Sequence, residues 1–332
     1  MSLTLSPADL TDPDIAAQLT RVADAATRVD GYAPFNEQTM LDLAAGRRSA
    51  HLFFADEHPN KPVGAAAVGH DGTTAELDLV IAPKRRGHGY GEAALTALLP
   101  SLPAVVTAWS HGDHPAARVL AIHHRFVAVR TLLHLQLCPL PPAVASTTDT
   151  PARSQPHAPD VTINSFVPGV DDEEWVALNA LIFASHPEQG SLTVTDLADR
   201  EAEPWFNADD FLVARDSTGR MIGYNWLKIE PAEAADDSDD RGDRGDRGDS
   251  DADGDSVSGG TGEIYVIGIH PDAAGHGLGR MLMERGLERL AARGCTAASL
   301  YVEADNTGAV HLYRSLGFTD FTIDVQYRRL TN

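Results

Sequence analysis

The sequence predicts two tandem domains of the α/β (α+β) class, each a mixed sheet flanked by helices. Three observations support this. The 332 residues are enough for two hydrophobic cores of ordinary size. A glycine-rich pattern occurs twice, 188 residues apart, as Gly87-His88-Gly89-Tyr90-Gly91 after Pro83 and as Gly275-His276-Gly277-Leu278-Gly279 after Pro271. A proline-rich stretch lies between the copies, where a boundary is needed.

Each glycine pattern is preceded by the signal of a strand and followed by that of a helix. Leu79–Ile81 and Ile267–Ile269 are the apolar runs, and 93–99 and 281–292 have the helical pattern. The other expected strands also come in matching pairs: 51–55 with 211–214, 63–69 with 222–229, 77–81 with 263–269, 105–109 with 298–302, and 130–137 with 323–328. We therefore expect a mixed sheet in each half, with the glycine loop joining a central strand to its helix.

Composition sets the expected boundaries. We place the first domain at residues 1–140, a proline-rich linker at 141–159 and the second domain at 160–332. Between Ala232 and Gly260, ten Asp and one Glu against three Arg carry −8 of the net charge of −22. Such a segment has too little apolar surface to order itself, so we expect residues 232–260 to be a disordered acidic loop inside the second domain.

Composition also limits the partners. The acidic balance disfavours nucleic acid and anionic membranes, because both require a basic surface. No stretch approaches the roughly 20 apolar residues of a transmembrane helix, and the N-terminus has no signal-peptide pattern. The two cysteines, Cys138 and Cys295, lie in different halves and predict neither a disulfide framework nor a metal site. We expect a cytoplasmic monomer that uses no metal.

The glycine loops are candidate phosphate sites. A glycine-rich turn that opens a helix leaves backbone N–H groups unpaired at the positive end of the helix dipole. Neither copy has the Gly-Lys-Ser/Thr of a P-loop, and a dinucleotide fingerprint would need glycine where Glu92 and Arg280 stand. A plain tight turn is the alternative for one loop, but two copies with the same proline offset favour a phosphate site.

The loops resemble the acetyl-coenzyme A signature of the GNAT superfamily of N-acetyltransferases, Gln/Arg-x-x-Gly-x-Gly/Ala. The first copy matches as Arg86-x-x-Gly89-x-Gly91, whereas the second has Ala274 at its first position. The resemblance implies two tandem GNAT domains with mixed, mostly antiparallel sheets. It also implies acetyl-coenzyme A as co-substrate.

The halves differ in a second mark of that superfamily, an Asn-led helix that ends in Tyr and Gly-Phe. It is present from Asn306 through Tyr313 to Phe318, whereas the first-half counterpart, 114–126, has no Asn at its start and Ile122 or His123 near the tyrosine position. We therefore expect the second domain to catalyse, and the first to be degenerate and non-catalytic.

Acetyl transfer from a thioester to an amine requires a base, a polarised carbonyl and a proton for the thiolate. Glu263 begins the strand that leads to the second loop, so it is the expected base, directly or through water. Backbone N–H groups near Ile269 are expected to polarise the thioester oxygen. Tyr313 is the expected proton donor, with a core aromatic as the alternative. We expect no catalytic role for His88, His276 or Cys295.

Further motifs in both halves resemble the mycothiol synthase family of tandem GNAT proteins. They are Val29 to Gln38, His186-Pro187-Glu188-Gln189-Gly190, Gly223 to Lys228 and Gly262 to Gly268. The resemblance implies acetylation of the cysteinyl amine of a cysteinyl-glucosaminyl-inositol, giving mycothiol and coenzyme A. Two alternatives stay open: an acetyltransferase for another small-molecule or protein amine, and a coenzyme A-responsive binding protein without turnover.

Carried over residue by residue, the resemblance implies three sets of contacts. The acceptor substrate would meet Glu37, Glu188, Lys228, Glu263 and Tyr301. Acetyl-coenzyme A in the second domain would meet Ile267, Gly268, Ile269, Ala274, Gly275, His276, Gly277, Leu278, Gly279, Arg280, Asn306, Thr307, Gly308, Ala309, Val310 and His311. A nucleotide in the first domain would meet Leu79, Val80, Ile81, Gly87, His88, Gly89, Tyr90, Gly91 and Glu92.

Overall fold

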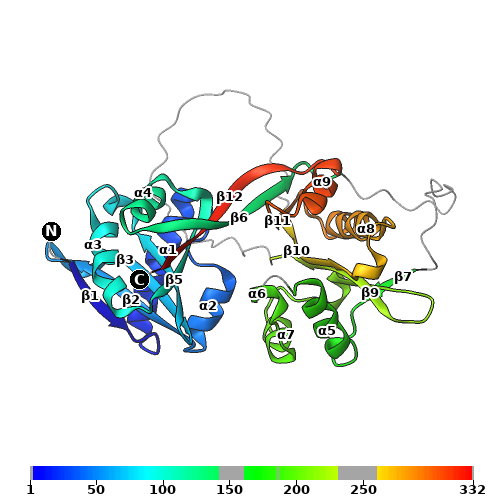
Figure 1. Cartoon of the computed structure of the whole chain (residues 1–332), viewed down its shortest axis with the longest axis horizontal. Coiled ribbons are helices and arrows are strands. Elements are labelled where there is room, and N and C mark those ends of the chain that lie inside the picture. The colour runs from blue at the N-terminus through cyan, green and yellow to red at the C-terminus, as the bar shows by residue number, and fades with distance from the viewer. Residues whose placement is uncertain (1–2, 142–160, 185–186, 231–259, 331–332) are drawn as a thin grey trace, which may run out of the picture. The chain divides into compact units, whose positions relative to one another are not determined.

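The computed structural model describes residues 3–141, 161–184, 187–230 and 260–330 (Figure 1). The expected linker, apart from Pro141, and the expected acidic loop, apart from Gly260, lie outside the described residues. The chain divides into two compact units, which we call unit 1 and unit 2. Unit 1 holds residues 1–134, 302–307 and 320–332, and unit 2 holds residues 135–301 and 308–319.

Unit 1 is a sheet with helices on both faces. Its strands run in the order β1-β2-β3-β4-β5-β12-β6. The pairings β1–β2, β2–β3, β3–β4 and β5–β12 are antiparallel and β4–β5 is parallel, so the sheet is mixed and mostly antiparallel as expected. The strands are β1 (Leu3–Ala8), β2 (Arg48–Ala55), β3 (His58–Asp71), β4 (Thr74–Ile81), β5 (Val105–Ser110), β6 (Phe126–Leu137) and β12 (Thr319–Leu330).

Two apolar clusters cover the two faces of the unit 1 sheet. One packs α3 (Tyr90–Leu98) and α4 (Pro115–His123) against the sheet through Leu95, Leu98 and Ala121. The other packs α1 (Pro13–Asp30) and α2 (Glu37–Ala44) against it through Leu19, Val22 and Leu43. The start and end of α1 follow its sequence, because Asp12 accepts a hydrogen bond from Asp14 N–H and Gly31 ends the helix at a φ of 80°.

Unit 2 repeats this plan. Its strands β7 (Thr162–Ser165), β8 (Phe211–Arg215), β9 (Met221–Lys228), β10 (Thr261–Ile269) and β11 (Ala297–Glu303) lie side by side in that order, with only β10–β11 parallel. An aromatic cluster that includes Trp175, Trp205 and Trp226 packs α5 (Asp172–Ile182) and α7 (Val194–Glu201) on the sheet. Leu278 and Leu282 of α8 (Leu278–Ala292) lie in a second cluster. The remaining helices are α6 (Pro187–Gly190) and α9 (Thr307–Ser315).

The last strand of the chain belongs to unit 1. We expected residues 160–332 to form one domain, but 302–307 and 320–332 cluster with the first half. Pairing explains this, because β12 lies antiparallel to β5 from Val325–Ser110 to Leu330–Val105. Buried Asp324 on β12 adds polar contacts to unit 1, accepting a hydrogen bond from Gly112 N–H at 2.9 Å and lying 2.8 Å from His111 Nδ1.

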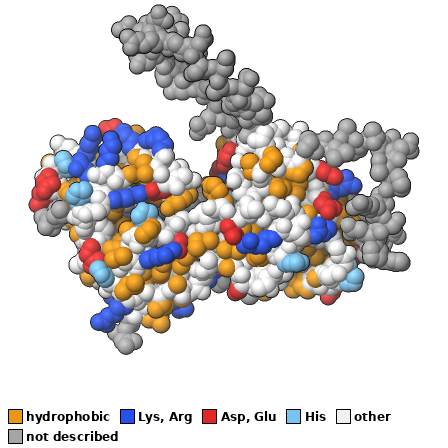
Figure 2. Space-filling model, turned by 90° about the horizontal axis from the view of Figure 1, so that it is seen from above, with side chains coloured by type: hydrophobic (Ala, Val, Ile, Leu, Met, Phe, Trp, Pro, Cys, Tyr) orange, Lys and Arg blue, Asp and Glu red, His pale blue; other side chains and the backbone are white. Residues whose placement is uncertain are grey.

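Two further observations concern the helices and the surface charge. Within the described ranges, no helix combines the length and apolar character that a membrane span requires. Although the chain is acidic, Lys and Arg side chains gather at one edge of unit 1 in the view of Figure 2.

Candidate active site

Both glycine loops form the backbone seat that the sequence predicts. Gly89 and Gly277 are the N-cap residues of α3 and α8, with φ of 77° and 86°, and neither helix start has a side-chain cap. Left-handed φ at these positions favours glycine. A Cβ added at either residue would meet no heavy atom within 4 Å, so open space adjoins each loop. The unpaired N–H groups of both helix starts can therefore receive an anion.

The central strands separate just before each loop. In unit 2 the parallel ladder of β10 with β11 runs from Thr261–Ala297 to Ile264–Leu300, and in unit 1 that of β4 with β5 runs from Thr74–Val105 to Leu77–Ala108. Among the described residues, β10 beyond Ile264 and β4 beyond Leu77 keep only their antiparallel partners. This leaves one backbone edge of 266–269 and of 78–81 for an extended ligand.

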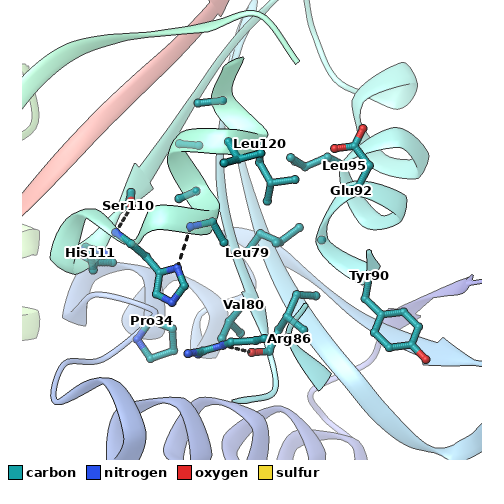
Figure 3. A pocket seen from close by; sticks show the side chains of 18 of the residues that line it. Pro34, Leu79, Val80, Arg86, Tyr90, Glu92, Leu95, Ser110, His111 and Leu120 are labelled. Carbon is teal, nitrogen blue, oxygen red and sulfur yellow. Dashed lines mark hydrogen bonds between the residues drawn. The ribbon is translucent and has the colours of Figure 1, made fainter. Parts of the chain in front are cut away.

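In unit 1 this opening adjoins a cavity of about 550 Å³ (Figure 3). Eight of the nine residues predicted to meet a nucleotide in the first domain line it: Leu79, Val80, Ile81, Gly87, Gly89, Tyr90, Gly91 and Glu92. Leu95 of α3 and Leu120 of α4 converge in the cavity, and the ring of Tyr90 points away from them. A cavity of this size with apolar walls suits a small ligand.

Arg86, the first residue of the better-matched signature, is bound within unit 1. Its guanidinium donates two hydrogen bonds to Asp30, at 2.6 and 2.7 Å, and a third from Nε to the Ile81 carbonyl at 3.0 Å. The bonds to Asp30 raise the pKa of Arg86, so the pair stays charged. Arg86 therefore ties the end of α1 to the loop, and the backbone is left as the main anion seat. Ala274 in unit 2 lacks such a tie.

Unit 2 brings three of the predicted acceptor residues onto neighbouring strands. Glu263 on β10 is in register with Lys228 on β9 and with Ser299 on β11, and Tyr301 follows two residues after Ser299. Residues in register, and residues two apart along a strand, share one face of a sheet. Lys228, Glu263 and Tyr301 therefore lie on one face, and Tyr301 is 45% exposed.

A β-bulge distinguishes β10 from its unit 1 counterpart. Ile264 pairs with Leu227 and Val266 with Trp226, so the register shifts by one residue at Tyr265. The ladder of β4 with β3 runs without interruption from Ile81 to Thr74. Counting along the ladders from the glycine loop, Glu263 therefore corresponds to Glu76, although the 188-residue offset matches it with Ala75.

In unit 1 the residues that correspond to Glu263 and Lys228 have other partners or no side chain. Glu76 is 3.0 Å from Arg48 Nη2. Lys228 corresponds to Gly69, which has no side chain. Unit 1 therefore lacks the combination of an ammonium and a carboxylate that Lys228 and Glu263 provide in unit 2.

Tyr313 is buried in α9, at 6% exposure, and its ring packs near Phe318 with the centroids 6.2 Å apart. Burial raises the pKa of Tyr313 to about 12, so the hydroxyl stays protonated throughout the neutral range.

Helices α8 and α9 are held together by Arg280 Nη2, which donates to Ser315 Oγ at 2.5 Å, and by Leu312, which adjoins Gly279.

The other predicted contacts are distributed as follows. Ile267–Ile269 are on β10, Ala274–Gly277 form the loop, Leu278–Arg280 begin α8, and Gly308–His311 belong to α9 in unit 2. Asn306 and Thr307 cluster with unit 1, as does Glu37 at the first turn of α2. Glu188 lies in α6 of unit 2.

The turn that carries Glu188 is anchored to α5. Asn179, fully buried, donates from Nδ2 to the Gln189 carbonyl at 2.6 Å. Its Oδ1 accepts from Gln189 Nε2 at 3.2 Å and from the Tyr224 hydroxyl at 2.8 Å. A buried polar side chain almost always has hydrogen-bond partners, so an asparagine within an apolar helix is the signal that could have indicated these bonds. No motif in the sequence marks Asn179, Arg200 or Trp205, and Tyr265 has no assigned role within the motif from Gly262 to Gly268.

Unit 1 contains a buried charged group beside its cavity. Burial raises the pKa of Asp78 to about 6, although the charge of Arg48 and the hydrogen bond from Thr39 lower it. Burial disfavours the charge of His111, but its hydrogen bond to Asp324 and the nearby carboxylates outweigh this and raise its pKa. Nε2 of His111 and Oδ1 of Asp78 are buried without a hydrogen-bond partner. Both shifts favour bound protons in the folded protein, so the stability of unit 1 falls as pH rises.

Comparison with known proteins agrees with the GNAT resemblance of the sequence. The model of the acetyltransferase (GNAT) family matches residues 20–121 and 175–318. The chain is 41% identical to the mycothiol acetyltransferase of Clavibacter sepedonicus over 318 residues, which cover 96% of this chain and 93% of that one. It is 36% identical to the mycothiol acetyltransferase of Kocuria rhizophila, covering 99% of this chain and all of that one.

Solved structures agree on the fold. A tandem GNAT protein from the clavulanic acid biosynthesis pathway has a TM-score of 0.67 at 15% identity, with 99% of this chain and 98% of that chain covered. A GCN5-related N-acetyltransferase from Sphaerobacter thermophilus has a TM-score of 0.64 at 20% identity, with 99% and 95% covered. At these identities the likeness concerns the fold alone.

Proposed function

This chain belongs to the GNAT acetyltransferase family, within its mycothiol acetyltransferases, and from that premise we propose that unit 2 catalyses acetyl transfer from acetyl-coenzyme A to the cysteinyl amine of cysteinyl-glucosaminyl-inositol, giving mycothiol and coenzyme A. One observation carries the choice of unit. Glu263, on the strand β10 that leads to the second glycine loop, lies in register with Lys228 on the neighbouring strand β9, and the described residues of unit 1 have no such combination.

The residues of unit 2 fit acetyl-coenzyme A. The start of α8 offers unpaired N–H groups and open space beside Gly275 and Gly277 for a pyrophosphate. The edge of β10 over 266–269, beyond its ladder with β11, suits the amide-bearing arm of the molecule. When bound, acetyl-coenzyme A supplies an activated acetyl group and a thiolate leaving group.

Glu263 is the proposed base. The cysteinyl amine, with an α-amino pKa near 8, is largely protonated at neutral pH and must lose a proton to react. Glu263 can accept that proton directly or through a water molecule. Its position near the start of the open edge of β10 supports this role.

Tyr313 is the proposed donor to the departing sulfur. With a pKa of about 12 it is a much weaker acid than a thiol, whose reference pKa is about 8.5. We therefore propose that it stabilises the sulfur by a hydrogen bond as negative charge develops, rather than by releasing its proton beforehand.

Carboxylates and an ammonium suit the acceptor, which has many hydroxyl groups and a positive charge. Glu263, Lys228 and Tyr301 would contact it from one face of the unit 2 sheet, and Glu188 from the anchored α6 turn. We propose that Asn306 to His311 at the start of α9 contact the co-substrate.

Unit 1 is proposed to bind acetyl-coenzyme A without turnover. Its cavity, its open strand edge and its uncapped α3 support binding, while the pairing of Glu76 with Arg48 and the absence of a tyrosine equivalent to Tyr313 argue against catalysis. We further propose that the protein acts as a cytoplasmic monomer and needs no metal.

The test is incubation of purified protein with acetyl-coenzyme A and either the cysteinyl glycoside or unrelated amines. The N-acetyl product is measured by mass spectrometry, because the acceptor's own thiol gives a background with thiol reagents. Acetylation of the cysteinyl amine alone supports the proposal. Acetylation of other amines only, or binding without turnover, would favour the corresponding alternative.

A further inference from the structure

Unit 2 contains a group of side chains beside Lys228 to which the proposed reaction assigns no role. Lys228 Nζ lies 5.1 Å from the centroid of the Trp205 ring and 5.9 Å from that of the Tyr265 ring. The two rings are themselves 5.1 Å apart, at an angle of 57°. A cation within about 6 Å of an aromatic ring is attracted by the ring quadrupole. The ammonium of Lys228 is thus held by two rings, which we call the aromatic wall.

Both rings of the wall are fixed from behind. The Tyr265 hydroxyl accepts a hydrogen bond from Arg200 Nε at 3.0 Å, and Arg200 Nη1 donates to the Asp196 carbonyl on α7 at 2.8 Å. Trp205, at 5% exposure, packs on Trp226 with centroids 5.7 Å apart. The wall is therefore a rigid part of the core surface and does not need to be ordered when a ligand binds.

Alternation along β10 accounts for the side on which Tyr265 lies. Tyr265 is two residues after Glu263, so it shares the face of Glu263 and Lys228, and its ring reaches Trp205 and Trp226 on that side. Lys228 lies in register with Glu263, two residues before Tyr265. Glu230 Oε1, 2.9 Å away, further restrains the Lys228 ammonium.

We propose that Trp205 and Tyr265 are positioning residues that hold the Lys228 ammonium in place for the hydroxyl-rich acceptor beside Glu263. A lysine has about 2 kcal/mol of rotamer entropy, and holding it beforehand removes that cost from binding. The inference rests on the proposed function in taking the acceptor to bind at Lys228. It adds that acceptor affinity depends on side chains set back from the substrate.

The first experiment compares Trp205→Leu, Trp205→Phe and a control, Phe206→Leu. Loss of the wall should raise KM for the cysteinyl amine by about 5- to 30-fold, with kcat and KM for acetyl-coenzyme A changed by less than about twofold. Trp205→Phe keeps a ring and should restore part of the affinity. Phe206, which is partly buried, also packs edge-on to Trp226, at 5.9 Å, so its variant perturbs the same aromatic cluster and should leave KM unchanged.

A double-mutant cycle separates positioning from simple core damage. If Trp205 acts through Lys228, then Trp205→Leu should raise KM no further in a Lys228→Met background. Independent, multiplying increases would overturn the inference, as would an equal rise in Phe206→Leu.

Acceptor binding without acetyl-coenzyme A, measured by calorimetry, keeps the two proposals apart. Binding without acetylation by the wild-type protein would overturn the proposed function, and the cycle measured on binding would still decide the role of the wall. Acetylation with a multiplying cycle would overturn the wall alone. A wild-type protein that neither binds nor acetylates the cysteinyl amine would overturn both.

Discussion

The assignment of catalysis to unit 2 can be tested by a matched pair of substitutions, Gly277→Ala and Gly89→Ala. Both residues are helix N-caps with left-handed φ, and an added Cβ meets no heavy atom within 4 Å at either. The cost in the free protein is therefore backbone strain alone, about 1–2 kcal/mol. Each variant should lose about 2–8 °C in the Tm of its own unit.

The two variants should differ in catalysis. Strain that shifts the N–H groups of α8 weakens hydrogen bonds to a charged pyrophosphate, each worth about 1.5–3 kcal/mol. Gly277→Ala should therefore raise KM for acetyl-coenzyme A by about 10- to 100-fold. Gly89→Ala should leave the steady-state constants unchanged, but should weaken one of two acetyl-coenzyme A sites in an equilibrium titration.

The assay is mass spectrometry of the N-acetyl product over a range of acetyl-coenzyme A concentrations, with calorimetry for the binding sites. A raised KM in Gly89→Ala with no change in Gly277→Ala would transfer catalysis to unit 1. Equal effects in both would show that turnover depends on both loops, and would also refute the assignment.

Three further outcomes are expected. Glu263→Gln should lower kcat by about 10²- to 10⁴-fold with unchanged acetyl-coenzyme A affinity, and an unaltered kcat would remove it as the base. Tyr313→Phe should slow single-turnover acetylation by about tenfold, whereas an equal rate would show a packing role only. Because Asp78 and His111 have raised pKa values, thermal unfolding should show stability falling as pH rises, between about pH 4 and pH 6 as Asp78 loses its proton and further as His111 loses its proton. Asp324→Asn should flatten that profile, and a flat wild-type profile would contradict the reading of the buried group.

Local sequence signals predicted the repeated parts of the fold. The strands before both glycine loops and the helices after them occur as β4, β10, α3 and α8. These elements depend on apolar periodicity and on glycine at left-handed positions, which neighbouring residues alone determine. The phosphate seats were predictable for the same reason, because they consist of backbone.

The partner of the last strand could not be predicted in this way. Alternating apolar residues over 323–328 predict a strand, but they do not specify which edge it joins. In the structure β12 pairs with β5 of unit 1, and Asp324 forms its contacts with His111 and Gly112 there. Asp324 is more than 200 positions away from His111 and Gly112 in sequence, and only the folded chain brings it to them.

The bulge at Tyr265 also escaped prediction, because one extra residue in a strand leaves the apolar pattern almost intact. It nevertheless changes which residues correspond. A fixed offset of 188 residues aligns Glu263 with Ala75. The strand pairing shows instead that Glu76 is the counterpart of Glu263, because Glu76 pairs with Gly69 as Glu263 pairs with Lys228. Tyr265 is also one of the two rings of the aromatic wall. The motif from Gly262 to Gly268 therefore includes a residue whose surroundings only the structure shows.

The asymmetry between the units follows from what each function requires of the chain. A phosphate seat needs glycines and a helix start, and both units retain these after duplication. Catalysis needs several side chains at once, and in unit 1 Glu76 is paired with Arg48 while the counterpart of Lys228 is Gly69. Replacing Arg48 alone would release a carboxylate but supply neither an ammonium nor a tyrosine, so it should leave unit 1 inactive. The proposed role of unit 1, binding without turnover, follows from this difference in what the two functions require.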